Sequence, residues 1–179
     1  MPPHCDTRDG PVVKAAKMAL EKGNVNYALI WVPESAEGEA REAFEKTMRA
    51  RKRGKDAKEV ADDWFFETVI RLHRAGEGAP YTGLKPAGLD EGPVVPRAEK
   101  AIETSDSREV VGFLMETIED ELRERFNCVI VAKNYKVDDV EAGRKFVQAF
   151  IGFVVWSHHL YKFVKSGEGG HEEGAGHAD

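Results

Sequence analysis

The fold is decided by residues 56–74, which read DAKEVADDWFFETVIRLHR. Apolar side chains recur there every three or four positions, which is the repeat of an amphipathic helix with one buried face. This apolar stripe consists of Ala57, Val60, Ala61, Trp64, Phe65, Thr68 and Leu72. Asp56 is suited to cap the start of such a helix, and Gly76 is suited to end it. The stretch therefore predicts a helix that packs on other helices.

Similar repeats on both sides of this stretch predict an all-α fold. Further helices are expected at about 11–22, 34–53, 97–103, 105–131 and 138–164. Residues 27–32 fit either a helical run or an extended piece, and a loop rich in glycine and proline spans 76–96. We expect one helical-bundle domain of four to six helices over residues 1–165. A Gly/Glu/His-rich tail without fixed structure is expected over 166–179.

Composition and charge argue against several classes of protein. The net charge of −6 disfavours nucleic-acid binding, which depends on neutralising phosphates. No stretch approaches the roughly 18 apolar residues of a membrane span, and the N-terminus does not resemble a signal peptide. We therefore expect a cytoplasmic protein with neither a nucleic acid nor a membrane as partner. Its two cysteines, Cys5 and Cys128, are expected to be free thiols.

The last predicted helix is apolar almost all the way round from Phe146 to Trp156. A helix of this kind is either central in its fold or covered by another subunit. Self-association through residues 146–161 is therefore expected.

Several strings resemble a known family. They read HCDT at 4–7, DGPVVK at 9–14, GNVN at 23–26, AFEKT at 43–47, WFFET at 64–68 and RLHRAGEGAPYTGLKP at 71–86. Together they resemble a family of small bacterial and archaeal helical proteins, catalogued only as a domain of unknown function. The resemblance covers roughly residues 3–161. It implies a helical fold and no particular activity.

The N-terminal pattern His-Cys-Asp-x-x-x-Gly, residues 4–10, is also similar to the metal-binding hook of nickel superoxide dismutase. In that hook an N-terminal histidine, two cysteines and backbone nitrogens hold nickel. This chain has Asp9 at the position of the second cysteine and Val12 at that of the hook tyrosine, and Met-Pro-Pro precedes His4. The resemblance implies metal binding, while these departures remove a thiolate and the free terminal amine.

A metal site can also be argued from the residues themselves. His4, Cys5 and Asp6 offer an imidazole, a thiolate and a carboxylate, a set that suits Fe, Ni, Zn or Co. Because three adjacent side chains diverge, Glu67 and His73 of the helix at 56–74 are candidates for the remaining positions. The alternatives are a polar N-terminus with an incidental thiol, a Glu67–Arg71 ion pair, and a His73 that is hydrogen-bonded to the loop.

The long loop holds a second set of candidates. Arg74, Tyr81, Thr82 and Lys85 offer cations and hydroxyl groups that suit an anion or a pocket cover. The alternative is a rigid connector that packs Tyr81 and Leu84 on the bundle. The loop matches no phosphate-binding motif.

The sequence is therefore compatible with two functions. The first is a metal-binding helical bundle, a small redox metalloprotein with its site at His4, Cys5 and Asp6. The alternative is a non-enzymatic homo-oligomeric interaction or ligand-binding module. The residues do not decide whether the protein is an enzyme.

Overall fold

The computed structural model describes residues 3–166, which form α-helices joined by 3-10 helices, turns and one long loop. These residues contain no β-strand, only an isolated bridge between Thr7 and Lys85, and the predicted all-α class is confirmed. The chain divides into two compact units, Met1–Gly92 and Pro93–Asp179. The single domain over 1–165 stays a prediction. The predicted tail lies outside the described residues except for Ser166, the last residue of a helix.

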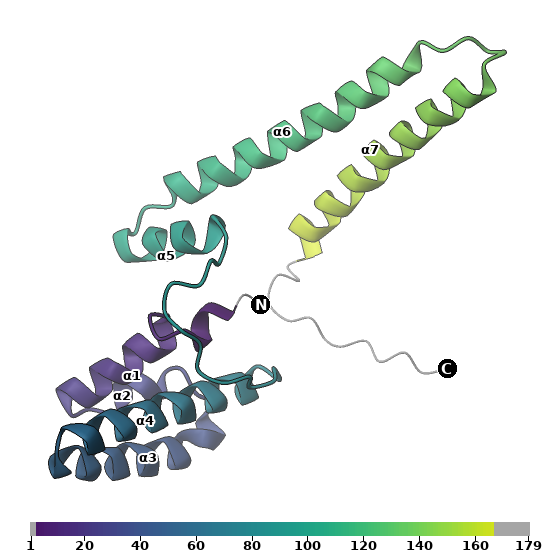
Figure 1. Cartoon of the computed structure of the whole chain (residues 1–179). Coiled ribbons are helices and arrows are strands. Elements are labelled where there is room, and N and C mark those ends of the chain that lie inside the picture. Colours follow the sequence, from purple (N-terminus) through teal and green to yellow (C-terminus); the bar gives the residue numbers. More distant parts are fainter. Residues whose placement is uncertain (1–2, 167–179) are drawn as a thin grey trace, which may run out of the picture. The chain divides into compact units, whose positions relative to one another are not determined.

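The first unit is built from seven helical segments (Figure 1). In chain order they are η1 (Pro3–Asp6), α1 (Pro11–Lys22), α2 (Asn26–Leu29), η2 (Glu34–Ala36), α3 (Glu37–Ala50), η3 (Arg51–Arg53) and α4 (Lys55–Gly76). The segment that the sequence left open, 27–32, begins as the short helix α2. Pro11 occupies the first turn of α1, as expected for a residue that lacks the backbone N–H.

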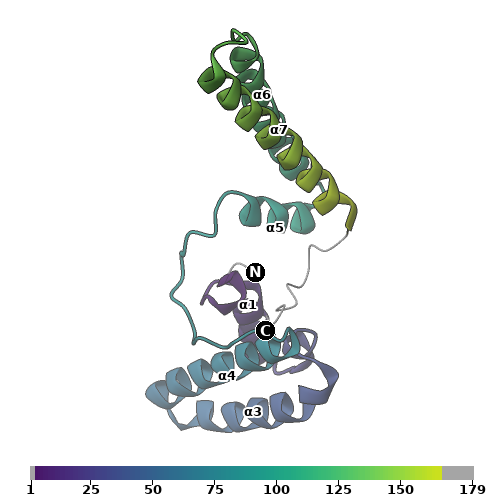
Figure 2. The ribbon, with the colours of Figure 1, turned by 90° about the vertical axis from the view of Figure 1, so that its right-hand side faces the viewer.

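The core of this unit is centred on α4, whose Phe65, Val69 and Ile70 are fully buried. It packs against α1 and α3, which lie beside it in Figures 1 and 2. The facing side chains of α1 and α3 are largely small, so that the helices approach closely; they include Ala16, Ala19, Ala40 and Ala43. Each large apolar side chain buried in this way stabilises the fold by about 1.5–3 kcal/mol.

The second unit consists of α5 (Val94–Thr104), α6 (Arg108–Lys133) and α7 (Val140–Ser166). The helices α6 and α7 run side by side as a long antiparallel hairpin in both views (Figures 1 and 2). No helix in the described part of the chain has the length and apolar character needed to cross a bilayer.

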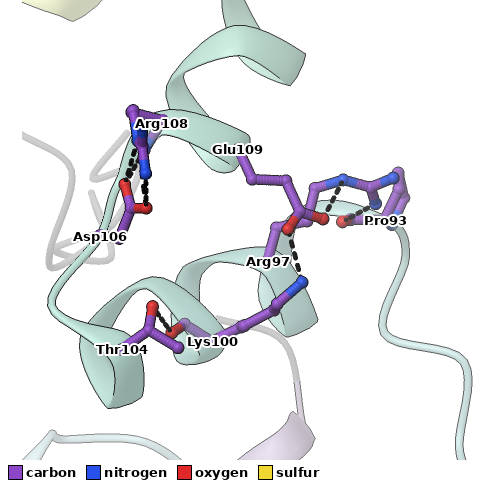
Figure 3. A network of polar contacts seen from close by, with 7 residues as sticks. All are labelled: Pro93, Arg97, Lys100, Thr104, Asp106, Arg108 and Glu109. Atoms are coloured by element: carbon purple, nitrogen blue, oxygen red, sulfur yellow. Dashed lines mark hydrogen bonds and ion pairs between the residues drawn. The ribbon is translucent and has the colours of Figure 1, made fainter.

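Charged side chains fix the elbow between α5 and α6 (Figure 3). The Asp106 carboxylate accepts hydrogen bonds from the Arg108 backbone N–H and guanidinium, and so closes the turn before α6. Lys100 of α5 donates to Glu109 of α6 at 2.7 Å. The Arg97 guanidinium lies 4.3 Å from the centre of the Phe113 ring. The two ion pairs are exposed, so each contributes little to stability and mainly orients the turn between the helices.

The tight turn before α1 depends on Gly10. Its N–H donates to the Thr7 carbonyl at 3.0 Å, and a Cβ at this position would lie 1.8 Å from the carbonyl oxygen of His4. The backbone of residues 4–10 can therefore fold back on itself only if the position has no side chain.

We predict that Gly10→Ala destabilises the first unit by about 2 kcal/mol or more, because the new methyl group clashes with backbone that cannot move aside cheaply. Gly38→Ala is the matched control, since Gly38 lies in α3 with no atom near its virtual Cβ. That control should be neutral or slightly stabilising. Urea denaturation of both variants measures the difference, and equal stability would contradict the prediction.

Candidate functional site

The segment that precedes α1, residues 4–10, is held along the loop that follows α4; we call it the N-terminal strap. The backbone N–H of Lys85 donates to the Asp6 carbonyl at 2.7 Å, and the Arg8 N–H donates to the Lys85 carbonyl at 3.0 Å. Two segments almost 80 residues apart in sequence are thereby joined by main-chain hydrogen bonds. The strap is therefore a fixed part of the first unit.

A side-chain contact extends this junction. The Asp9 carboxylate accepts a hydrogen bond from the Gly88 N–H at 2.9 Å. That bond, together with one from the Thr7 side chain, lowers the pKa of Asp9 below its ordinary value. Because the pKa is depressed in the folded state, the contact stabilises the fold at neutral pH and is lost as the pH falls into the acidic range.

The centre of the site is a buried ion pair between the strap and α4. The Arg74 Nε donates to the Asp6 Oδ1 at 2.7 Å, and the side chains are only 5% and 4% exposed. The Arg74 Nη1 also lies 3.1 Å from Glu77. The hydrogen bond to Asp6 raises the pKa of Arg74 in spite of the opposing effect of burial, so the guanidinium stays charged. The Asp6 carboxylate, predicted as a metal ligand, is thus occupied by a cation of the protein.

His73 lies next to this pair with both ring nitrogens close to protein oxygens. Its Nδ1 is 2.9 Å from the Trp31 carbonyl, and because a carbonyl only accepts, Nδ1 carries the proton. Its Nε2 faces Glu77 at 3.4 Å, and the ring meets the Trp31 indole edge-on. His73 therefore connects α4 to the segment after α2, which is a structural role.

His4 and Cys5 lie together at the start of the strap. Cys5 is buried and His4 is partly buried, with 3.7 Å between the Sγ of Cys5 and the Nε2 of His4. Glu67 is not part of this cluster, since it is exposed on α4 and lines a separate cavity of about 290 Å³ with Trp64 and Tyr81. Within residues 3–166, no group of three or more His, Cys, Asp or Glu side chains is placed to hold a metal ion.

The loop candidates serve mainly to hold the loop in place. Lys85 donates its Nζ to the Thr82 carbonyl at 3.0 Å, and its backbone pairs with the strap. Tyr81 and Leu84 pack on the core of the first unit, and burial raises the pKa of Tyr81. This arrangement resembles the rigid connector more than an anion site, and ligand binding by Arg74, Tyr81, Thr82 and Lys85 stays a prediction.

Sequence reasoning missed Glu77, which touches both Arg74 and His73. Its spacing of three and four residues from them is the spacing at which charged side chains of one helix meet. The contacts of Glu77 could therefore have been predicted from the sequence. The Trp31 carbonyl left no such signal, because main-chain partners have no sequence signature.

We predict that Asp6→Asn destabilises the first unit by about 3 kcal/mol, because it leaves a buried guanidinium with one carboxylate in place of two. The control is Glu39→Gln, which removes the partner of Arg71 in an exposed ion pair and should cost less than about 1 kcal/mol. Urea denaturation of the full chain compares them. Equal losses would mean that the Asp6–Arg74 pair does not hold the strap.

Comparison with known proteins identifies a family without an assigned activity. No curated protein and no solved structure matches the chain. The resemblance to the nickel superoxide dismutase hook therefore remains a hypothesis. A model of a family of unknown function, DUF6448, matches residues 9–156, which is most of the chain. The protein belongs to this family of unknown function, as the strings in its sequence led us to expect.

Proposed function

We propose that the protein is a non-enzymatic homo-oligomeric module in which the α6–α7 hairpin associates with a second copy of itself. The observation that carries this proposal is how little the hairpin buries. Among the described residues of the second unit, Val129 alone is buried, at 7% exposure. Helices of 26 and 27 residues need much more buried apolar surface than this to be stable.

Two apolar stripes run along α7. The inner stripe faces α6, as the Phe126–Phe153 ring contact and the Arg125–Trp156 contact indicate. Its members are Phe146, Ala149, Phe153, Trp156 and Leu160. The outer stripe consists of Val147, Phe150, Val154 and Tyr161, which are 48%, 49%, 45% and 63% exposed. At 3.6 residues per turn the stripes lie roughly 120° apart, which is typical of a helix with two neighbours in a bundle. The hairpin supplies only one neighbour.

Exposed apolar side chains of α6 enlarge this surface. Phe126 and Ile130 are 49% and 43% exposed, and their helical positions put them on the side of the hairpin where Phe150 and Val154 lie. The opposite side is a more polar groove lined by Glu124, Cys128, Lys145 and Gln148, among others. The apolar side, which we call the open face, thus carries exposed apolar side chains from both helices, and a contiguous surface of this kind is typical of an interaction site.

A second hairpin of the same kind has the dimensions to cover the open face. Both helices are about 40 Å long, so two copies would pair along their whole length as a four-helix bundle. Residues 146–161 contain no Asp, Glu, Lys or Arg, so nothing charged would be buried in the middle of the contact. Burying the whole open face therefore compensates for the entropy lost on association better than burying a small patch would.

We predict that the full chain is at least dimeric in solution and that Val154→Glu makes it monomeric, because a buried unpaired carboxylate opposes association. Light scattering coupled to size exclusion measures the molar mass. Gln148→Glu is the control, since it adds the same charge on the polar side of the hairpin.

The control variant should keep the molar mass of the wild-type chain. A wild-type chain that is monomeric, or a V154E variant that associates as well as Q148E, would refute the proposal.

Metal binding is a second candidate function, and one distance favours it. Zn–S and Zn–N bonds of about 2.3 and 2.0 Å at a tetrahedral angle place the two ligand atoms about 3.5 Å apart. The 3.7 Å between the Sγ of Cys5 and the Nε2 of His4 is close to this value. With Asp6 bound to Arg74, water or another chain would have to supply the remaining ligands.

If this site binds a transition metal, Co²⁺ added to the purified chain should give a thiolate charge-transfer band with about one ion per chain. Cys5→Ser should abolish the band. Cys128→Ser should keep it, because Cys128 lies in the other unit. A band that persists in C5S, or no band at all, would exclude His4 and Cys5 as ligands.

A further inference from the structure

We infer that the cavity beside Trp64 in the first unit binds a small alkylammonium ion. Its walls are side chains of α3, of α4 and of the loop that follows α4, and its volume is about 290 Å³. That volume is at the lower end of the range of ligand pockets, so it suits a ligand of few non-hydrogen atoms. The inference does not depend on the association of the second unit. The lining consists of Glu39, Trp64, Glu67, Thr68, Arg71 and Tyr81.

The cavity carries one negative charge that no ion pair compensates. Glu39 of α3 and Arg71 of α4 form an ion pair with each other, so their charges cancel. Glu67 makes no ion pair with any residue of the range 3–166. Its charge acts on Arg8, but both oxygens of Asp63 already hold that guanidinium at 2.7 Å. Because the other lining residues are neutral, the cavity attracts a cation and repels an anion.

Two aromatic side chains add to this attraction. Trp64 is 43% exposed and precedes Glu67 by three positions, so the two side chains are neighbours on one side of α4. The face of an indole ring attracts a cation more strongly than that of any other aromatic side chain. Tyr81 contributes a second ring from the loop. An ammonium group in the cavity would meet a carboxylate and an aromatic face, while its alkyl stem covers the exposed part of Trp64.

The Tyr81 hydroxyl supplies a further polar group. Its oxygen is buried, and the hydroxyl donates no hydrogen bond within the part of the chain that the structure describes. Burial raises the pKa of Tyr81 and the charge of Glu67 raises it further, so the phenol stays neutral and close enough to feel that carboxylate. A neutral hydroxyl can accept a hydrogen bond from an ammonium N–H.

An organic cation fits this lining better than a metal ion does. Aromatic rings offer no ligand atoms to a metal, and hard cations such as Mg²⁺ and Ca²⁺ require several oxygen ligands. No group of three or more metal-ligating side chains is found between residues 3 and 166. An alkylammonium ion, in contrast, uses the carboxylate through its charge and the rings through both its charge and its apolar stem.

Titration of the full chain with n-butylammonium at constant ionic strength tests the site. The indole N–H signal of Trp64 in a ¹H–¹⁵N NMR spectrum reports binding at the cavity itself, and its absence in Trp64→Phe identifies it. We expect a saturable shift with a Kd on the order of 1 mM, which is reasonable for so small a ligand. Butanol and butyrate have the same stem without the positive charge. They should bind about tenfold more weakly or not at all.

A pair of matched variants tests the role of the carboxylate. Glu67→Gln removes the uncompensated charge and should weaken butylammonium binding about fivefold. Glu21→Gln removes the same charge from α1, where Glu21 is exposed and does not line the cavity, and should leave the Kd unchanged. Both positions are exposed, so neither substitution should disturb the fold, and circular dichroism checks this.

Three results would overturn the inference. The Trp64 signal could fail to move with butylammonium, it could move equally with butanol and butyrate, or it could saturate at the same concentration in E67Q as in the wild type. The comparison of the three ligands uses the wild-type chain, so it decides the question whatever the variants do to the fold.

Discussion

A hairpin of two helices has a single seam, and that seam cannot cover both apolar stripes of α7. The inner stripe is met by α6 at Phe126 and Arg125, and the outer stripe has no neighbour within the second unit. In the first unit the same requirement is met within the chain, because α4 packs against α1 and α3 and buries Phe65, Val69 and Ile70. The first unit therefore closes its own core, while the second offers an apolar surface to a partner.

The polar centre of the first unit has a different physical role. Asp6 and Arg74 are both almost completely buried, and a pair of this kind recovers little more than the cost of removing two charges from water. What it adds is specificity, since only one placement of the strap brings Asp6 to Arg74. The main-chain bonds between Lys85 and the strap then tie the long loop to the same point.

This arrangement changes the interpretation of the N-terminal residues. From the sequence, His4, Cys5 and Asp6 were predicted to act together because their side chains are of the types that bind metals. In the fold, Asp6 forms an ion pair with Arg74, and His73 donates a hydrogen bond to the Trp31 carbonyl. His4 and Cys5 lie close to each other. Ion pairs and metal sites use the same residue types, and only the partners distinguish them.

The helices could be predicted from the sequence because their periodicity is local. The buried face of α4 could be predicted only in part: Ala61, Phe65, Thr68 and Leu72 are buried as expected, but Val60 is 72% exposed. Phe66, Val69 and Ile70, outside the predicted stripe, are buried because α4 contacts helices on two sides. A single stripe assumes a single neighbour, and the number of neighbours is a property of the tertiary fold.

The pairing of Asp6 with Arg74 and that of the strap with the Lys85 backbone could not be predicted from the sequence, because the paired residues lie about 70 to 80 positions apart in the chain. Loop closure over such distances is decided by the packing of the whole unit, and no local pattern encodes it. The apolar character of residues 146–161, in contrast, is local, and it led from the sequence directly to the hypothesis of self-association.

The most direct test of that hypothesis is amide hydrogen exchange of α7 in the wild-type chain as a function of protein concentration. If a second copy covers the open face, protection of the α7 amides rises with concentration by mass action, while that of α4 stays constant. Protection of α7 that is the same at all concentrations would contradict the account, because the hairpin would then owe its stability to its own chain.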